Sequence, residues 1–429
     1  MIKILKAEDV ELDSVFARRG DTAALSSAVS DIIATVAGNG DLALREYSLR
    51  FDKCELSDIE VSAADIDAAI SLVEPEYIEI LKKAAKNIED FHACQVKQGF
   101  VLNTGGGKVV GQKVLPIERV GIYVPGGTAA YPSSVLMNCI PAKIAGVSEI
   151  IMCTPPSFAG GVNPVILAAA KIAGVDRVFR VGGAQAVAAM AHGTESVPKV
   201  DKIVGPGRDF VAEAKRQVYG IVGIDMVAGP SEILVIADDS ANPRHVAADM
   251  LSQAEHDENA SAVLVTTSEM LAAAVAAEID IQLLSLPRVD IASASIESFG
   301  KIILVNSIEK AIEISNRLAP EHLEVCVDSP FDYLDSIKNA GSIFLGKNCP
   351  EALGDYFAGP NHTLPTLGTA RFSSSLSVDD FVKRSSFTYY TKDALGAVAN
   401  DIAFFAEKEG LSGHARSVLS RFSDEGEKK

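Results

Sequence analysis

Several features are scarce or absent in these 429 residues, and each absence excludes a class of protein. No apolar run approaches the roughly 20 residues that a membrane-spanning helix needs. The N-terminal segment is charged and lacks a long apolar stretch before a small-residue cleavage site, so it does not resemble a secretory signal. The formal net charge of −18 argues against the basic face that nucleic-acid binding requires. We therefore expect neither a membrane nor a nucleic acid as a partner.

Cysteine and tryptophan are the scarcest residue types. The six cysteines are scattered, no two of them form a CxxC pair, and tryptophan is missing altogether. In a chain of this length, such cysteines predict reduced thiols that fill the core rather than a disulfide framework. They favour a cytoplasmic location. The absence of tryptophan excludes nothing.

The residues that are present predict an α/β protein. Apolar residues make up 48% and charged residues 22%, as in ordinary globular proteins, and the length suggests two or three domains. From residue 119, short apolar runs begin roughly every 25–30 residues with helix-like segments between them, a spacing typical of βαβ units and a parallel sheet. The predicted strands are Val120–Val124, Glu149–Cys153, Arg177–Val181, Lys202–Val204 and Glu232–Ala237.

A second α/β pattern follows residue 240. One helix is predicted from Pro243 to about residues 253–256, and others over 268–284 and 308–318. The predicted strands are Val263–Thr266, Ile302–Val305, Leu323–Val327 and Ile343–Leu345. The glycine-rich segment NTGGGKVVGQ (103–112) predicts a loop or hairpin. We expect the last 50 or so residues to be mainly helical.

Three predicted strands end in glycine turns, with the sequences YVPGGTA, RVGGAQA and IVGPGRD. Helix-like segments follow the last two turns, from Ala184 and Arg208. A strand, a glycine turn and a helix N-terminus together place backbone N–H groups beside a phosphate. None of the three matches GxGxxG, and each by itself is explained equally well as an ordinary turn. Three such turns at one sheet edge nevertheless favour a ligand there.

Four of the seven histidines stand beside acidic, glycine or proline residues, namely His256, His322, His362 and His414. The segment APEHLEV places Glu321 and His322 between a helix and an apolar strand. A buried Glu–His pair suits general acid–base chemistry, because burial can raise the pKa of a glutamate into the range in which histidine titrates. A satisfied polar turn is the alternative reading.

A metal site is also possible. The polar segment 354–377 is longer than most loops, so we expect an ordered functional loop with Asp355 as its most ligand-like carboxylate. Zinc accepts histidine nitrogen and aspartate oxygen, which makes Asp355, His256 and His414 the candidates. No spacing rule joins these three residues.

The stretch QAEHD (253–257) poses a choice between two ligands. Gln253 is spaced i,i+3 from His256 and i,i+4 from Asp257, so either can share its face of a helix. The apolar face of this segment lies nearer Asp257, so periodicity favours the carboxylate. If the helix ends near residue 254, that preference lapses.

Longer motifs resemble the histidinol dehydrogenase family over nearly all of residues 20–420. They are RVGIYVPGGTAAYPSSVLMN, VGGAQAVAA, VDKIVGPG, AGPSEILVIAD, LSQAEHD, APEHLEV, EGLSGHARSV, and EALGDYFAGPNHTLPT followed after Leu367 by GTARFSS. The resemblance implies oxidation of L-histidinol to L-histidine through bound L-histidinal, with two successive hydride transfers to NAD⁺, the last step of histidine biosynthesis. It also implies one Zn²⁺ per subunit.

The resemblance assigns roles by position. The implied zinc ligands are Gln253, His256, Asp355 and His414. The implied catalytic acid–base residues are Glu321 and His322. The implied substrate contacts are Ser231, Gln253, His256, His322, Asp355, His362, Glu409 and His414. The implied NAD contacts are Tyr123, Gln185 and Arg208.

The resemblance also implies an architecture. We expect two similar α/β domains with incomplete Rossmann-like parallel sheets, and small helical N- and C-terminal tails that intertwine in a homodimer with shared active sites. The expected parts are an N-terminal tail (1–19), a first α/β domain with the metal and acid–base residues (20–119 and 233–376), an NAD-binding α/β domain (120–232), and a C-terminal helical tail that contributes to the partner's site (377–429).

One position departs from the family pattern. Where the family usually has GPGN, this chain has Arg208. Arginine is long, cationic and only a donor, so the contact of the asparagine does not transfer. Arg208 pairs either with the NAD pyrophosphate or with Asp209. The departure leaves open a related zinc- and NAD-dependent dehydrogenase of another small polar alcohol, such as a sulfonated diol. The intact Glu321–His322 pair argues against a metal-binding protein without catalysis.

Overall fold

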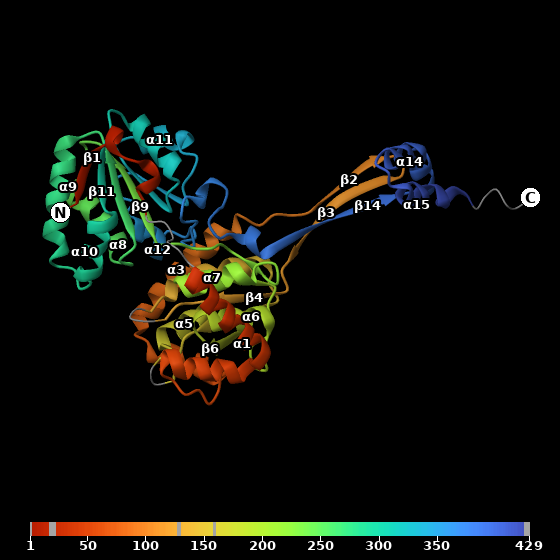
Figure 1. Ribbon diagram of the computed structural model, residues 1–429, viewed down its shortest axis with the longest axis horizontal. Helices are drawn as coiled ribbons and strands as arrows, with labels where there is room; N and C mark the ends of the chain where they lie inside the picture. The colour runs from red at the N-terminus through yellow and green to blue at the C-terminus, as the bar shows by residue number, and fades with distance from the viewer. Residues whose placement is uncertain (1, 17–22, 127–129, 158–159, 424–429) are drawn as a thin grey trace, which may run out of the picture. The chain divides into compact units, whose positions relative to one another are not determined.

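A computed structural model of the protein describes residues 2–16, 23–126, 130–157 and 160–423. The chain divides into two units. The larger comprises Met1–Val96 and Ile117–Phe381, and the smaller comprises Lys97–Pro116 and Val382–Lys429. The larger unit contains two parallel sheets, and the smaller contains one antiparallel sheet with helices (Figure 1). Within the described residues, no helix is long and apolar enough to cross a membrane.

The first parallel sheet has five strands in the order β6-β5-β4-β7-β8. Its strands are β4 (Arg119–Tyr123), β5 (Glu149–Thr154), β6 (Arg177–Arg180), β7 (Lys202–Val204) and β8 (Gly223–Ile224). The chain proceeds from β4 through β5 to β6, and then places β7 on the other side of β4. The boundary between β4 and β7 is therefore the topological switch point. Open α/β sheets bind ligands there, beyond the carboxyl ends of the strands.

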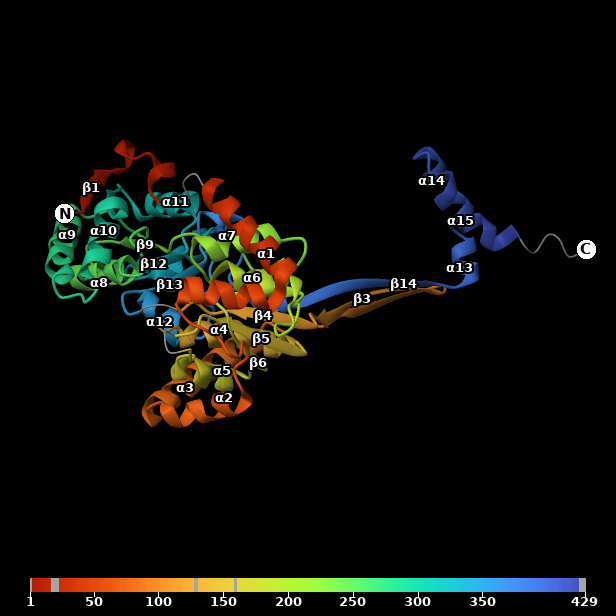
Figure 2. The same ribbon diagram turned by 60° about the horizontal axis from the view of Figure 1, so that its bottom comes forward.

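Helices cover both faces of this sheet (Figure 2). One face carries α1 (Ala23–Tyr47), α6 (Gly183–His192) and α7 (Asp209–Val218). The other carries α3 (Pro75–Ala93), α4 (Pro132–Ala145) and α5 (Pro164–Ala173), with α2 (Ala63–Ala69) packed on α5. Successive residues of β5 serve the two cores in turn, Ile150 and Met152 on one side and Ile151 and Cys153 on the other. Because both faces are buried, the strands appear in the sequence as continuous apolar runs.

The helices before residue 96 belong with this sheet. The sequence-based expectation joins residues 20–119 to 233–376, but α1 packs on α6 and α7, and α3 packs on α4 and α5. Their apolar faces supply the reason, since Val29 and Val36 of α1 share a core with Val187, and Leu81 and Ile88 of α3 share another with Leu136.

The second parallel sheet has six strands in the order β1-β11-β10-β9-β12-β13. Its strands are β1 (Lys3–Lys6), β9 (Glu232–Ala237), β10 (Ser261–Thr266), β11 (Lys301–Leu304), β12 (His322–Cys326) and β13 (Ser342–Leu345). The helices α8 (Pro243–Ala254), α9 (Glu269–Leu283) and α10 (Val289–Phe299) cover one face, and α11 (Ile308–Leu318) covers the other. From β11 to β13 the strand order repeats that of the first sheet, with β1 added at the edge. The expectation of two similar α/β domains is confirmed.

The smaller unit is built on the antiparallel order β14-β3-β2. Its elements are β2 (Phe100–Gly105), β3 (Lys108–Pro116), β14 (Val382–Tyr390), α13 (Lys392–Gly396), α14 (Ala399–Lys408) and α15 (Ser412–Ser423). The predicted glycine hairpin is confirmed, because Gly105, Gly106 and Gly107 all have positive φ and join β2 to β3.

All nine predicted strands are present, with ends within two residues of those predicted. Apart from β2 and β3 of the hairpin, three further strands were not predicted. β1 lies in a segment that we expected to be a helical tail, and β14 lies in a tail that we expected to be mainly helical. β8 has only two residues, and β14 is exposed or half-buried throughout, so neither shows the apolar pattern by which a strand is recognised.

Candidate functional site

The predicted acid–base pair lies at the amino end of β12. His322 is the first residue of this strand, Glu321 precedes it, and they are only 4% and 7% exposed. β12 pairs with β9 in parallel, so Glu232 at the start of β9 lies beside them. This is the edge opposite to the one at which α/β sheets usually bind ligands.

Hydrogen bonding and burial together define the state of the His322 ring. Its Nδ1 lies 3.1 Å from the backbone oxygen of Glu232, and since a carbonyl oxygen only accepts, Nδ1 carries the proton in this contact. Burial lowers the pKa of His322 to about 4, so the ring is neutral near pH 7 and Nε2 keeps its lone pair. Nε2 is buried without a hydrogen-bond partner among the described residues. A neutral imidazole with a free nitrogen is the form that a general base requires.

Glu321 is held by the same residue of β9. Its Oε2 accepts a hydrogen bond of 2.8 Å from the Glu232 N–H and lies 3.7 Å from His322 Nδ1. Burial raises the pKa of Glu321 well above its ordinary value. Neighbouring groups whose pKa values are driven in opposite directions are typical of acid–base sites.

Two carboxylates face the free nitrogen of His322. Glu351 and Asp355 lie on α12 (Glu351–Tyr356) with i,i+4 spacing, which places them on one face of the helix. His322 Nε2 is 3.9 Å from Glu351 Oε1 and 3.9 Å from Asp355 Oδ1. One ligand atom each of His256, Glu351 and Asp355 lies within 4.8 Å of the other two. The structure therefore gathers a nitrogen and two carboxylates around one point.

These donors fit a divalent cation. Gln253 is 1% exposed, and within the described chain its Oε1 has no hydrogen-bond partner, a costly state for a buried oxygen. Burial and the charge of Asp355 raise the pKa of Glu351 to about 8. Burial acts in the same direction on Asp355, but His362 and the other nearby histidines outweigh it and lower the pKa of Asp355 to about 2. A cation would compensate both carboxylates, and the mixture of nitrogen and oxygen donors suits zinc.

The stretch QAEHD follows the geometry of a helix end. α8 ends at Ala254 with Glu255 as its C-cap, so the helical wheel does not extend to residues 256 and 257. His256 joins Glu351 and Asp355, whereas Asp257 Oδ2 lies 3.4 Å from Arg208 Nη2. The periodic preference for Asp257 therefore lapses, because the helix that would enforce it has ended.

The remaining predicted substrate contacts fall into two groups. His362 Nδ1 is 3.6 Å from Asp355 Oδ1, and Ser231 directly precedes Glu232 at the start of β9. Glu409 is the C-cap of α14 and His414 lies in α15, so these two exposed residues belong to the smaller unit.

Sequence reasoning placed Asp355 in a loop and did not single out Glu351. Asp355 is instead in the last turn of α12, and the segment after it is tied down by Asn361, whose Nδ2 donates to the backbone oxygen of Met137 at 2.6 Å. The spacing of the two acids in EALGD was the available signal, since four residues make one turn of a helix.

The three predicted NAD residues follow strands of the five-stranded sheet or end one. Tyr123 ends β4, is 4% exposed, and accepts a hydrogen bond of 3.1 Å from the Gly183 N–H through Oη. Gln185 is buried in the first turn of α6, and Arg208 is the N-cap of α7 with its side chain 82% exposed. β4 and β7 flank the switch point, so Tyr123 and Arg208 stand on either side of it. Residues 127–129 of the turn YVPGGTA lie outside the described residues.

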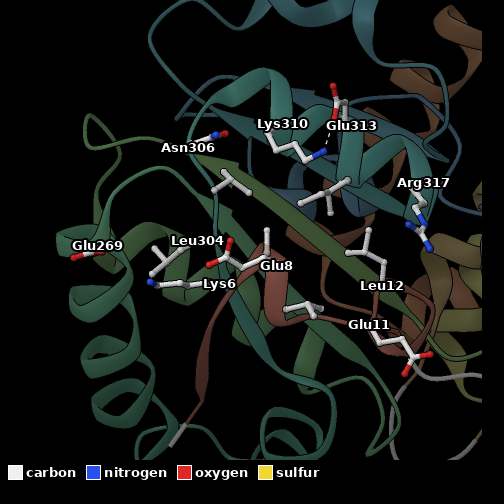
Figure 3. Close-up of a pocket in the computed structure, with 14 residues that line it drawn as sticks. Lys6, Glu8, Glu11, Leu12, Glu269, Leu304, Asn306, Lys310, Glu313 and Arg317 are labelled. Carbon is white, nitrogen blue, oxygen red and sulfur yellow. Dashed lines mark hydrogen bonds and ion pairs between the residues drawn. The ribbon is translucent and has the colours of Figure 1, made fainter.

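A separate pocket of about 770 Å³ lies beyond the carboxyl ends of β1 and β11. Lys6, Leu304 and Lys310 are among its lining residues (Figure 3). Of the described residues that line it, none is a predicted site residue. It is therefore distinct from the acid–base and metal cluster.

The two sites define a class of protein. A carboxyl edge with glycine turns suits a dinucleotide, and a neutral buried histidine beside a cation site suits removal of a proton from a small substrate. Together they are typical of an α/β oxidoreductase that combines a dinucleotide with a divalent cation.

Comparison with known proteins identifies the family. The profile of the histidinol dehydrogenase family matches residues 17–422. Histidinol dehydrogenase from Clostridium acetobutylicum is 58% identical over 402 residues, 94% of this chain and 93% of that protein. The Listeria monocytogenes enzyme is 55% identical over 92% of this chain and 93% of its own length. The crystal structure of histidinol dehydrogenase from Elizabethkingia anophelis has a TM-score of 0.93 and 41% identity, covering 99% of this chain and 98% of that one.

The chain belongs to the histidinol dehydrogenase family. Members of this family are NAD-dependent, zinc-binding oxidoreductases of histidine biosynthesis.

Proposed function

We propose that the chain oxidises L-histidinol to L-histidine through bound L-histidinal, at the site around His322. The carrying observation is the neutral His322 ring, whose free Nε2 is 3.9 Å from a carboxylate oxygen of each of Glu351 and Asp355. A buried nitrogen with a lone pair beside two carboxylates supports a base next to the donors that would hold a cation and substrate.

His322 and Glu321 would act in turn. In the first oxidation, His322 Nε2 accepts the proton of the alcohol while a hydride passes to NAD⁺, which leaves the aldehyde. In the second, Glu321 would accept a proton from the water that adds to the aldehyde, while His322 returns its proton to the aldehyde oxygen. The hydrate would then lose a hydride to another NAD⁺ and a hydroxyl proton to His322, which leaves the acid. Burial raises the pKa of Glu321 well above its ordinary value, so its carboxyl group holds a proton more readily than an exposed carboxylate does.

The proposed zinc ligands are Gln253, His256, Asp355 and His414, with Glu351 as a further candidate from the geometry of the cluster. When bound, zinc would supply positive charge that orients the substrate and favours loss of the alcohol proton. Ser231 and His362 are proposed substrate contacts, because one adjoins Glu232 and the other adjoins Asp355. Glu409 is a further proposed substrate contact.

We propose that Glu409 and His414 reach the site of a second copy in a homodimer. Both are exposed residues of the smaller unit. This unit also exposes a set of large apolar side chains, as expected of a surface that another chain covers: Phe100, Val101, Leu102, Tyr389, Phe404 and Phe405.

Mixing two inactive proteins tests the shared site. His322→Asn and His414→Asn chains, unfolded and refolded together, should form heterodimers in which one of the two sites is intact, and NADH formation should partly return. No recovery, with heterodimers present, would place His414 in its own chain's site.

Turnover with and without metal tests the proposed function as a whole. L-histidinol and NAD⁺ should yield NADH with the zinc-loaded protein, a chelator should abolish the reaction, and added zinc should restore it. Faster turnover of another small polar alcohol would favour the alternative substrate class, and no NADH with any of them would contradict the enzymatic proposal.

We also infer a cytoplasmic location, which the six free cysteines support.

A further inference from the structure

A buried ion pair lies behind the glycine turn that follows β7. Lys215 of α7 and Asp225, which directly follows β8, pair through Nζ and Oδ1. Their side chains are only 2% and 1% exposed. Removing two charges from water is costly, and a pair of apolar side chains often stabilises a fold equally well. Stability alone therefore does not explain the pair, and the groups that it binds indicate its role.

Both side chains bind the same residue of the turn. Lys215 Nζ donates to the Gly205 backbone oxygen at 2.9 Å, and the Gly205 N–H donates to Asp225 Oδ2 at 2.8 Å. Gly205 is buried, so neither of its backbone groups would find water if the pair were lost. The pair thus holds Gly205 through both its backbone N–H and its backbone C=O.

The conformation of Gly205 explains why such a hold is needed. Its φ of +116° favours glycine, and glycine is the residue with the greatest backbone freedom. A Cβ at this position would lie 2.1 Å from the backbone oxygen of Tyr123. The turn therefore packs directly against the last residue of β4. A small displacement of the turn would change the spacing between the ends of β4 and β7.

The turn leads straight to Arg208. Gly205, Pro206 and Gly207 connect the end of β7 to this residue, the N-cap of α7. Tyr123 and Arg208, on opposite sides of the switch point, are thus joined through one glycine that the Lys215–Asp225 pair holds. A shift of Gly205 would move both at once.

We propose that Lys215 and Asp225 are positioning residues for NAD⁺, which set the Gly205–Gly207 turn so that the switch point between β4 and β7 accepts the dinucleotide. This inference rests on the proposed function, because it takes NAD⁺ as the ligand of this edge. Neither residue touches the acid–base or metal cluster through any contact of the described residues. We therefore expect their loss to impair NAD⁺ binding alone.

If the ion pair served stability alone, its loss would have a different effect. Its loss would lower stability without a selective effect on one substrate, and replacing both charges with apolar groups would repair the loss. A positioning pair differs, because an apolar replacement removes the buried charges but leaves the backbone N–H and C=O of Gly205 without partners, so the turn stays loose.

The test uses the zinc-loaded full chain with Lys215→Met, Asp225→Asn and the double variant K215M/D225L. Titration calorimetry should show NAD⁺ binding weakened about tenfold or more in K215M and in the double variant. D225N should be affected less, since an amide oxygen can still accept from the Gly205 N–H. The KM for L-histidinol and the bound zinc should stay within twofold of the parent values. Amide hydrogen exchange of Gly205, Gly207 and Arg208 should be faster in the double variant than in the parent.

Lys143→Met is the matched control. Lys143 on α4 pairs with Asp176, which accepts from the Ile150 N–H at the amino end of β5, so this ion pair lies at the opposite edge of the same sheet. K143M should bind NAD⁺ as the parent does. A double variant that binds NAD⁺ with the parent affinity would overturn the inference alone. A parent protein without NAD⁺ binding would overturn both the inference and the proposed function.

Discussion

The two parallel sheets share one strand order, yet their predicted functional residues lie at opposite edges. In the five-stranded sheet, Tyr123 ends β4 and Arg208 follows β7, both at the carboxyl edge. In the six-stranded sheet, Glu321 stands before the amino end of β12. Topology explains the first edge, since crossovers leave a crevice at the switch point. The second edge is defined by side chains and by the backbone of Glu232, which binds both acid–base residues.

The comparison teaches that a repeated topology does not repeat a function. The carboxyl edge of the six-stranded sheet has a pocket of its own, yet none of the described residues that line it is a predicted site residue. At the amino edge, α8 runs antiparallel to β9 and brings Gln253 and His256 back to the start of that strand. The crossover helix α8 therefore brings possible metal ligands to the amino edge of the sheet.

The largest expected effect concerns the amino edge alone. His322→Asn should lower kcat by about 10²–10⁴-fold, because a positioned general base contributes that much to proton transfer. NAD⁺ and zinc binding should change little. NADH formation at saturating substrates, with NAD⁺ titrations, measures both. A rise in the KM for L-histidinol equal to the loss in kcat would instead indicate a binding role.

A second variant separates the metal cluster from the helix end beside it. Glu351→Gln should weaken zinc binding by about 10–100-fold, as loss of a supporting group around a metal commonly does. Glu255→Gln is the control, since Glu255 is the C-cap of α8 and does not belong to the cluster. Competition with a chromogenic chelator measures both. Equal affinities for the two variants would remove Glu351 from the site.

Arg208→Asn tests the carboxyl edge. If Arg208 contacts the NAD pyrophosphate, the KM for NAD⁺ should rise by up to about fivefold, since an exposed charge contact contributes at most about 1 kcal/mol. Asp257→Asn is the companion variant, because Arg208 Nη2 lies 3.4 Å from Asp257 Oδ2. This substitution would free the Arg208 side chain to contact the phosphate. We expect D257N to keep or lower that KM. An unchanged KM in R208N would contradict the phosphate contact.

The smallest expected effect is on the pH dependence of stability and comes from Asp52, whose charge acts on Tyr123. Burial raises the pKa of Asp52 from 3.8 to about 6, so between these values the unfolded chain releases a proton that the folded chain keeps. Stability therefore falls as pH rises through this window, and the penalty is complete above about pH 6. Asp52→Asn should match the parent Tm below about pH 4 and exceed it slightly above pH 6. A difference in Tm that does not vary with pH would contradict the shift.

Most of the parallel sheets could be predicted from the sequence, because buried strands appear as apolar runs at regular spacing. β1, β8 and β14 could not, since one is exposed at a sheet edge, one has two residues and one is polar on its surface. The acid–base pair was predictable because Glu321 and His322 are adjacent. Glu351 has i,i+4 spacing to Asp355, but no local pattern shows that Ser252, which donates to its Oε2 at 2.8 Å, lies beside it.

The sequence by itself determined most of the buried strands, the glycine turns and the residue types that could bind a metal or move a proton, since these depend on neighbours along the chain. The tertiary structure decided which of them meet. It ended α8 at Ala254, which freed His256 from the helical wheel, and it brought α12 to the start of β12. It also placed Lys215 and Asp225 on the two sides of Gly205. Such meetings depend on packing between segments far apart in sequence, and no local pattern records them.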